Sequence, residues 1–275
     1  ARNPTDDRQG GGDVREGGER STEFRTERGT VTAVDGVDRA IEAGEVVGWV
    51  GESGSGKSVL AESLVGIVEE PGEIVDGDIG FSGEPLLDGS ADRRRELRGG
   101  RLSVVFQDPM NSLNPTLTVG EQIAESVRLH QDVGESVSLP AELKRKLVGA
   151  AKNGEAWRRA IEMLEAVEIP EPDARATDYP HEFSGGMRQR AMIAMALSCE
   201  PDLLVADEPT TALDVTIQAQ ILEELEELKD VFDTSILLIT HDLGVVAETC
   251  DRVNVMYAGE IVERAETREL FDDPQ

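Results

Sequence analysis

The segment Glu45–Ser58, EVVGWVGESGSGKS, decides the fold of this 275-residue chain. Its first six residues, EVVGWV, form an almost continuous apolar run, which is typical of a strand covered on both faces. The last eight, GESGSGKS at 51–58, match the pattern GxxxxGK[ST], and an apolar helical stretch follows through Ile67. This pattern binds phosphate when it connects a strand to a helix, as it does here. We therefore predict a nucleotide-binding site in an α/β fold.

The chemistry of this segment follows from its residue types. Its glycines let the backbone wrap closely around an anion, while successive N–H groups and the positive end of the helix point at that anion. Lys57 adds a charge on the β- and γ-phosphates, and the Ser58 hydroxyl can ligate Mg²⁺. A glycine-rich turn without a ligand is the alternative. The predicted phosphate-binding residues are Gly51, Glu52, Ser53, Gly54, Ser55, Gly56, Lys57 and Ser58.

A second run, DLLVADE at 202–208, ends a predicted buried strand with two adjacent carboxylates. Because adjacent side chains of a strand point in opposite directions, we expect the two acids to have different roles. Asp207 would hold the Mg²⁺ shell, and Glu208 would polarise a water that attacks the γ-phosphate. Acids at strand ends are common, so this prediction depends on the phosphate loop that precedes it.

A second candidate anion site lies in FSGGMRQR, residues 183–190. Ser184 is a typical N-cap residue, and Gly185 and Gly186 expose backbone N–H groups at the start of a helix. Two phosphate-binding ends with one set of metal carboxylates suggest a site shared between two copies. An ordinary capped helix is the alternative.

Outside these segments, strands and helices alternate, which predicts a mostly parallel sheet. Residues 109–183 are dominated by helical patterns and are predicted to be a helical insertion, whereas residues 1–20 hold one large apolar residue and are predicted to be disordered. Arg252–Tyr257 and Glu260–Val262 are predicted to form a hairpin. In the helix after Asp214, the face Glu223, Glu224, Glu226 and Glu227 is predicted to meet water.

The charge of the chain is strongly negative. The sequence has 56 acidic and 27 basic residues, a formal net charge of −29, and only 5 of the basic residues are Lys. Nucleic acids and anionic lipids repel such a surface, so we expect no nucleic-acid partner. An evenly acidic, lysine-poor chain is typical of a halophilic protein working in molar salt, where the Debye length falls to about 3 Å. An ordinary acidic cytosolic protein is the alternative.

Two further features limit the class of protein. No apolar run approaches the ~20 residues that span a bilayer, and no signal-peptide pattern is present. Cys199 and Cys250 form no CxxC pair and have no His at ligand spacing. We therefore expect neither a zinc site nor a disulfide framework, as in a reducing cytosol.

Taken together, the motifs resemble the ATPase cassette of ABC transporters over about residues 24–271. Gly51–Ser58 is similar to the Walker A motif of that family, Gln107 to its Q-loop glutamine, and Ser184–Gly186 to its signature. Leu203–Glu208 resembles Walker B with the catalytic Glu, 212–214 resembles the D-loop with Asp214, and His241 resembles the switch histidine. The resemblance implies an ABC-type P-loop ATPase fold for residues 21–275. This fold has a mostly parallel core sheet, an antiparallel β subdomain and an inserted helical subdomain, here at about 109–183.

Several stretches resemble the oligopeptide and dipeptide importer ATPases more closely. They are NSLNPTLTVGEQI (111–123), PHEFSGGMRQR (180–190), DEPTTALDVTIQAQIL (207–222) and ITHDLGVVAE (239–248). The resemblance implies an ATP- and Mg²⁺-dependent ATPase in which Gln107 joins Ser58 and Asp207 at the metal. Its partners would be membrane permease subunits, a sister ATPase subunit and, indirectly, an extracytoplasmic solute-binding protein. The chain would lie at the cytoplasmic face of the cell membrane.

Two departures from the family pattern concern the ends of the chain. The first strand of the family precedes the position of Phe24, but residues 11–20 are polar and rich in Gly, so we expect that strand to be absent or replaced. Phe24 would stack on adenine, with a core Phe as the alternative. The family commonly continues past 271–274 into a C-terminal extension, whereas this sequence ends at Gln275.

Two functions of other classes remain as alternatives. One is a soluble ABC-type ATPase that acts on DNA or ribosomes, which a coiled coil or a second cassette would support. The other is a scaffold that binds nucleotide without hydrolysing it, which the presence of Glu208 and His241 argues against.

Overall fold

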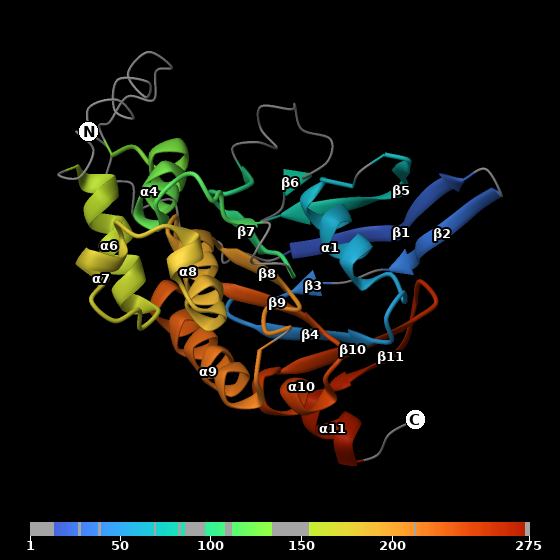
Figure 1. The fold of residues 1–275 in the computed structure, drawn as a ribbon. Coiled ribbons are helices and arrows are strands. Elements are labelled where there is room, and N and C mark those ends of the chain that lie inside the picture. The colour runs from blue at the N-terminus through green and yellow to red at the C-terminus, as the bar shows by residue number, and fades with distance from the viewer. Residues whose placement is uncertain are drawn as a thin grey trace.

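The described part of the chain consists of two sheets and a group of helices (Figure 1). The computed structural model describes residues 14–26, 29–37, 40–68, 70–81, 84–85, 97–107, 112–133, 154–211 and 213–272. Both the mixed α/β class and the mostly parallel core sheet that the sequence predicts are confirmed.

The central sheet has six strands in the order β11-β10-β4-β9-β8-β7. Neighbouring strands run parallel except for β10 and β11, which form the predicted antiparallel hairpin. The four parallel pairings bring the carboxyl ends of these strands to one edge of the sheet, and two of the pairings, β4 with β9 and β4 with β10, join strands that are not consecutive in the chain. The strands are β4 (Val46–Gly51), β7 (Leu102–Val105), β8 (Leu203–Asp207), β9 (Ser235–Thr240), β10 (Arg252–Tyr257) and β11 (Glu260–Glu266).

Strand β4 shows why the sheet is buried on both sides. Val46 and Val50 pack into a core with α8, α9 and α10, whereas Val47 and Trp49 pack into a second core with α1. This alternation follows from the two-residue period of a strand. The helices are α1 (Lys57–Val65), α8 (Gly185–Leu197), α9 (Val215–Phe232) and α10 (Leu243–Thr249).

The second sheet is antiparallel and lies beside α1 (Figure 1). Its strand order is β2-β1-β5-β6, and β3 also pairs with β1. A buried hydrogen bond of 2.9 Å between the hydroxyls of Thr22 and Ser63 joins β1 to α1. The strands are β1 (Val14–Thr26), β2 (Gly29–Val37), β3 (Ala40–Ile41), β5 (Gly72–Phe81) and β6 (Glu84–Pro85).

The start of β1 corrects one prediction. Residues 14–20, which we predicted to be disordered with the rest of 1–20, lie in this strand. A strand therefore does precede Phe24, where we expected the first strand of the family to be absent or replaced. The backbone pairs Val14 with Phe81 and Gly17 with Asp78. Ladder hydrogen bonds use backbone groups that every residue except proline carries, so a polar, glycine-rich segment can pair between two neighbours. Residues 1–13 lie outside the described part.

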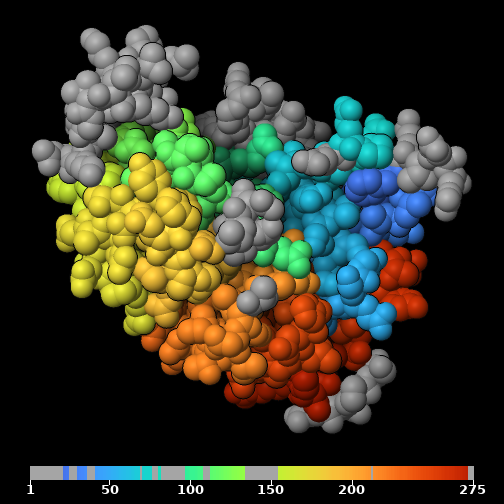
Figure 2. Space-filling view, viewed as in Figure 1, coloured from blue at the N-terminus to red at the C-terminus, as the bar shows by residue number. Residues whose placement is uncertain are grey.

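The helices between β7 and α8 lie on the side of the molecule opposite the antiparallel sheet, as the green and yellow surface shows (Figure 2). They come from within the predicted insertion 109–183, of which 109–111 and 134–153 lie outside the described residues. Within the described ranges, no helix combines the length and apolarity needed to cross a bilayer. The elements are α4 (Val119–His130), α6 (Glu155–Ala166), α7 (Pro172–Arg175) and the 3₁₀ turn η2 (Pro180–Glu182); α11 (Thr267–Asp272) follows β11.

One residue predicted to face water is buried. Glu224 of α9 is 9% exposed and forms an ion pair with Arg190 of α8, whereas Glu223, Glu226 and Glu227 are exposed. Burial raises the pKa of the Glu224 carboxyl to about 7, against the opposing charge of Arg190. Arg190 also donates to the carbonyl of Val167 at 3.0 Å, so its side chain joins the end of α6 to α8 and α9.

Candidate nucleotide site

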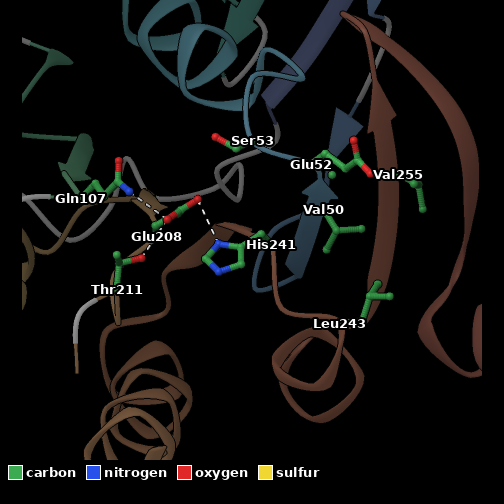
Figure 3. A pocket seen from close by; sticks show the side chains of 10 residues that line it. Val50, Glu52, Ser53, Gln107, Glu208, Thr211, His241, Leu243 and Val255 are labelled. Carbon is green, nitrogen blue, oxygen red and sulfur yellow. Dashed lines mark hydrogen bonds and ion pairs between the residues drawn. The ribbon is translucent and has the colours of Figure 1, made fainter. Parts of the chain in front are cut away.

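A pocket of about 660 Å³ lies at the carboxyl ends of the parallel strands (Figure 3). In an open α/β sheet this is the edge at which ligands bind. Strand β4 ends at Gly51, Glu208 follows β8, His241 follows β9, and Gln107 follows β7 shortly after its last residue. The lining residues are Val50, Gly51, Glu52, Ser53, Gln107, Glu208, Thr211, His241, Leu243 and Val255.

The loop between β4 and α1 forms one wall of this region. Gly54 and Gly56 have φ angles of +83° and +103°, which residues with a Cβ rarely adopt, and Gly56 is the N-cap of α1. Lys57 is 5% exposed, and its Nζ donates to the carbonyls of Gly51 at 2.8 Å and Glu52 at 2.9 Å. Burial lowers the pKa of Lys57, although the carboxylates of Glu208 and Asp207 oppose this shift. The ammonium therefore lies inside the loop.

Two neighbouring elements hold this loop in place. The carbonyl of Ser55 accepts from the N–H of Gly259 at 2.9 Å, and the carbonyl of Gly259 accepts from the N–H of Asp35 at 2.9 Å. A Cβ on Gly56 would lie 2.1 Å from the carbonyl oxygen of Ala33 in β2. The loop, the β10–β11 turn and β2 therefore meet in one junction, called the loop junction below.

Asp207, the last residue of β8, has an unsatisfied oxygen beside the loop. The residue is 6% exposed and accepts a hydrogen bond from Ser58, yet its Oδ1 has no hydrogen-bond partner in the part of the chain that the structure describes. Burial raises the pKa of this carboxyl, and the bond from Ser58 acts in the opposite direction. A buried carboxylate oxygen without a donor, next to a hydroxyl, suits a hard divalent cation. The residues present therefore fit Mg²⁺.

Glu208 has a different environment. Its φ of +46° turns the chain out of the strand, and its side chain is 15% exposed. Oε2 accepts from Nε2 of Gln107 at 2.9 Å and from the hydroxyl of Thr211 at 2.8 Å, and Oε1 accepts from Nδ1 of His241 at 3.2 Å (Figure 3). Since an ionised carboxylate only accepts hydrogen bonds, Nδ1 of His241 carries the proton in this contact.

The structure thus brings together most of the predicted residues. Gly51, Glu52 and Ser53 line the pocket with Gln107, Glu208 and His241, while Lys57, Ser58 and Asp207 adjoin it through the contacts above. Sequence reasoning missed Thr211 and the apolar wall of Val50, Leu243 and Val255. Thr211 lies in the quoted stretch DEPTTALD, but its spacing from Glu208 gave no sign that its hydroxyl reaches the carboxylate.

The predicted signature residues lie elsewhere, at the start of α8. The side chain of Ser184 caps the helix by accepting from the N–H of Met187 at 3.2 Å, as its residue type predicts. Asp214 likewise caps α9, accepting from Ile217 at 3.1 Å. The two helix starts adjoin, because a Cβ on Gly185 would lie 3.7 Å from Leu213 and one on Gly186 would lie 3.0 Å from Ile217. Ala212 lies outside the described residues.

Phe24 lies in the antiparallel sheet. Its backbone in β1 pairs with Val31 and with Gly72, and its side chain is half-buried. It does not line the 660 Å³ pocket described above. Its contact with adenine stays a prediction.

Comparison with known sequences finds similarity to ABC transporter proteins. The sequence model of a family described as ABC transporter matches residues 34–211. A probable peptide ABC transporter ATP-binding protein of Sinorhizobium fredii, y4tR, is 51% identical over 92% of this chain and 70% of its own length. The oligopeptide transport ATP-binding proteins OppD of Bacillus subtilis and Escherichia coli are 49% and 48% identical, over 92% and 91% of this chain. This chain spans 66% and 69% of those two proteins.

Solved structures show the same fold. A dimeric post-hydrolysis state of the ATP-binding cassette MJ0796, bound to ADP and Pi, superimposes with a TM-score of 0.76 at 25% identity. That match covers 93% of this chain and 99% of MJ0796. The cbiO1 protein of Clostridium perfringens, part of the ABC transporter complex cbiONQ, gives a TM-score of 0.73 at 26% identity, covering 96% of this chain and 92% of cbiO1.

Proposed function

The chain belongs to the ABC transporter family, and from this premise we propose that it is the ATP-binding and ATP-hydrolysing subunit of an importer for di- or oligopeptides. The named relatives, at about half sequence identity, are peptide or oligopeptide transport proteins, which favours this function over that of a soluble ATPase acting on DNA or ribosomes. The net charge of −29 also opposes a nucleic-acid partner.

One observation carries the ATPase function: the phosphate loop and the Glu208 carboxylate line the same pocket. The loop has N–H groups at the start of α1 and the Lys57 ammonium, both suited to the β- and γ-phosphates of ATP. Lys57 donates to loop carbonyls in this structure, so it would exchange these contacts for phosphate oxygens when ATP binds. Gly51–Ser58 would thus form the phosphate-binding part of the site.

Mg²⁺ would be held by Ser58 and Asp207, with Gln107 completing the ligand set. The unsatisfied Oδ1 of Asp207 supports this assignment. When bound, the ion would neutralise charge on the β- and γ-phosphates. Gln107 donates to Glu208 in this structure, so it must leave that carboxylate to reach a metal.

Glu208 would act as the general base. Its carboxylate accepts a proton from the attacking water as the water oxygen bonds to the γ-phosphorus. The bond from that phosphorus to the β,γ-bridging oxygen breaks, its electron pair stays with ADP, and inorganic phosphate is released. His241 contacts Glu208 in this structure, and we propose that it turns to the γ-phosphate in the closed state.

The signature residues would serve a second cassette. Ser184, Gly185, Gly186 and Asp214 gather at the adjoining starts of α8 and α9, outside the set that lines this chain's own pocket. A helix start with free N–H groups binds anions, so this surface suits the γ-phosphate held by a partner. The similarity to a dimer of MJ0796 bound to ADP and Pi supports head-to-tail closure of two cassettes, with a sister subunit or a second copy.

Transport itself would require membrane partners. We propose that residues 109–183 form a helical subdomain that docks on permease subunits at the cytoplasmic face of the membrane. An extracytoplasmic binding protein would deliver the solute to them. Movement of Gln107, which lies between β7 and this region, would couple the nucleotide to the docked permease.

The test is ATPase activity of the complex with its sister and permease subunits in liposomes, with and without an internal peptide. Glu208→Gln should lower turnover by about 10²–10⁴, since the amide accepts no proton, while ATP binding survives. Lys57→Ala should instead lose ATP binding. Because the γ-phosphate persists, Glu208→Gln should also form a dimer with ATP and Mg²⁺ in size-exclusion chromatography, where the wild type is monomeric.

The sister subunit carries its own inactivating Glu→Gln change, so that any hydrolysis measured comes from the site of this chain. Hydrolysis by Glu208→Gln at the wild-type rate in that background would refute the role of Glu208. Stimulation of the wild type by DNA or ribosomes, and not by permease and peptide, would refute the transport function.

A further inference from the structure

The hydroxyl of Thr211 lies closer to the Glu208 carboxylate than the side chain of Gln107 or of His241 does. The distance from Oγ1 of Thr211 to Oε2 of Glu208 is 2.8 Å, against 2.9 Å for Gln107 and 3.2 Å for His241. These three donors come from different parts of the sheet, and Figure 3 shows them converging on one carboxylate. Thr211 therefore contributes directly to the geometry of the proposed base.

Thr211 differs from the other two donors because it belongs to the same turn as Glu208. The backbone N–H of Thr211 donates to the carbonyl of Glu208 at 3.1 Å, and the N–H of Glu208 donates to the carbonyl of Ile239 in β9 at 2.9 Å. Gln107 and His241 instead follow β7 and β9. A rearrangement of either of those segments leaves the Thr211 hydroxyl beside Glu208.

The two carboxylate oxygens of Glu208 accept different numbers of hydrogen bonds. Each oxygen of a carboxylate has about two acceptor positions. Oε2 accepts from both Thr211 and Gln107, whereas Oε1 accepts only from His241 among the residues that the structure describes (Figure 3). Once His241 turns away, Oε1 has both positions available for water, while Thr211 still holds Oε2.

We propose that Thr211 is a positioning residue that orients Glu208, so that Oε1 receives the proton of the attacking water. The inference rests on the proposed function, in which Glu208 is the base. Thr211 touches neither ATP nor the reacting water in this scheme. It fixes the side-chain rotation of a residue whose backbone, at φ +46°, already lies in the left-handed region.

The test compares Thr211→Val, which keeps the shape of the side chain but removes the hydroxyl, with Thr211→Ser, which keeps the hydroxyl. In the full complex, Thr211→Val should lower kcat by about 10- to 100-fold, since a hydrogen bond to a charged group and the orientation of the base are both lost. The KM for ATP should not change, because Thr211 binds no phosphate. Thr211→Ser should restore most of kcat.

A second measurement is independent of hydrolysis. The chain has three histidines, so the imidazole NMR signals of the nucleotide-free protein are few, and His241→Ala assigns the one that contacts Glu208. Rotation of the carboxylate in Thr211→Val should shift this signal, and Thr211→Ser should return it to the wild-type position. If Thr211→Val does not fold, Thr211→Ala takes its place.

Wild-type kcat together with an unshifted His241 signal in Thr211→Val would overturn the inference. A loss of kcat that Thr211→Ser does not restore would also overturn it, because the hydroxyl would then not be the cause. If the wild-type complex itself hydrolyses no ATP, the proposed function fails. The NMR comparison then decides by itself whether Thr211 orients Glu208.

Discussion

Replacing Gly56 by Ala should damage the protein far more than replacing Gly54, although both glycines belong to the same loop and both have positive φ. At Gly54 a Cβ would meet no atom within 4 Å, so only the backbone conformation, at φ +83°, is strained. A left-handed conformation costs an ordinary residue about 1–2 kcal/mol. For a domain of this size that corresponds to a fall of roughly 2–8 °C in melting temperature.

At Gly56 the same backbone strain is joined by a collision. The Cβ would lie 2.1 Å from the carbonyl oxygen of Ala33 and 3.0 Å from Cε of Met256. The methionine side chain can move, but the carbonyl belongs to paired strand β2. The loop and the strand must separate by about 1 Å or more, since heavy atoms normally meet at about 3.5 Å or beyond. We expect a total cost of about 2–5 kcal/mol, because overpacking adds about 1–3 kcal/mol to the backbone strain of about 1–2 kcal/mol.

The assay is thermal and urea-induced unfolding of both variants without nucleotide, at one fixed KCl concentration. Omitting nucleotide matters because a Cβ at either position could also disturb bound phosphate. Gly56→Ala should lose at least twice the stability that Gly54→Ala loses. Equal losses, or a greater loss for Gly54→Ala, would refute the argument that β2 and the loop are in rigid contact.

Three further expectations concern the partner surface, the surface charge and the buried acid. Gly185→Asp should leave ATP binding intact in a nucleotide-binding assay but stop turnover in an ATPase assay. The Cβ of the new aspartate has room, because it would lie 3.7 Å from Leu213, but the new carboxylate would repel the γ-phosphate held by the partner. The melting temperature should rise with KCl, because salt screens the repulsion of a −29 chain; a flat or falling curve between low salt and 2 M would contradict halophilic adaptation. Folding raises the pKa of Glu224 from its ordinary 4.5 to about 7, so its stabilising contribution is complete below pH 4.5 and is lost as the pH rises through 7. Relative to Glu224→Gln, the wild type should therefore lose on the order of 3 kcal/mol between pH 4.5 and 8 in urea unfolding, and a constant difference would contradict this.

The parts of the fold that could be predicted from sequence are those whose cause is local. The run EVVGWV predicts β4 because its residues from Val46 to Val50 are all buried in the sheet. Ser184 predicts the start of α8 because its side chain caps that helix. Residues 14–20 could not be predicted in the same way. Their strand is held by backbone pairing with β5, more than sixty residues further along the chain, and no local apolar pattern indicates that pairing.

The same limit applies to predicting the residues of the site from sequence. Lys57, Asp207 and Glu208 were predicted because their motif positions carry their chemistry. Thr211 was missed because its contact depends on the positive φ of Glu208, a property of the folded turn. Glu224 was misassigned for a related reason: Arg190, which makes its burial tolerable, lies on another helix more than thirty residues earlier.

The loop junction has a consequence for anyone who wishes to attach a reporter to this protein. Exposed turns are the usual places to insert an epitope tag or a fluorescent peptide, and Tyr257 and Ala258 are both exposed. The next residue, Gly259, is buried, and its N–H and carbonyl bind Ser55 and Asp35. Extra residues in this turn would break both bonds and release the phosphate loop from its support. A tag placed there would abolish nucleotide binding while the turn still looked accessible.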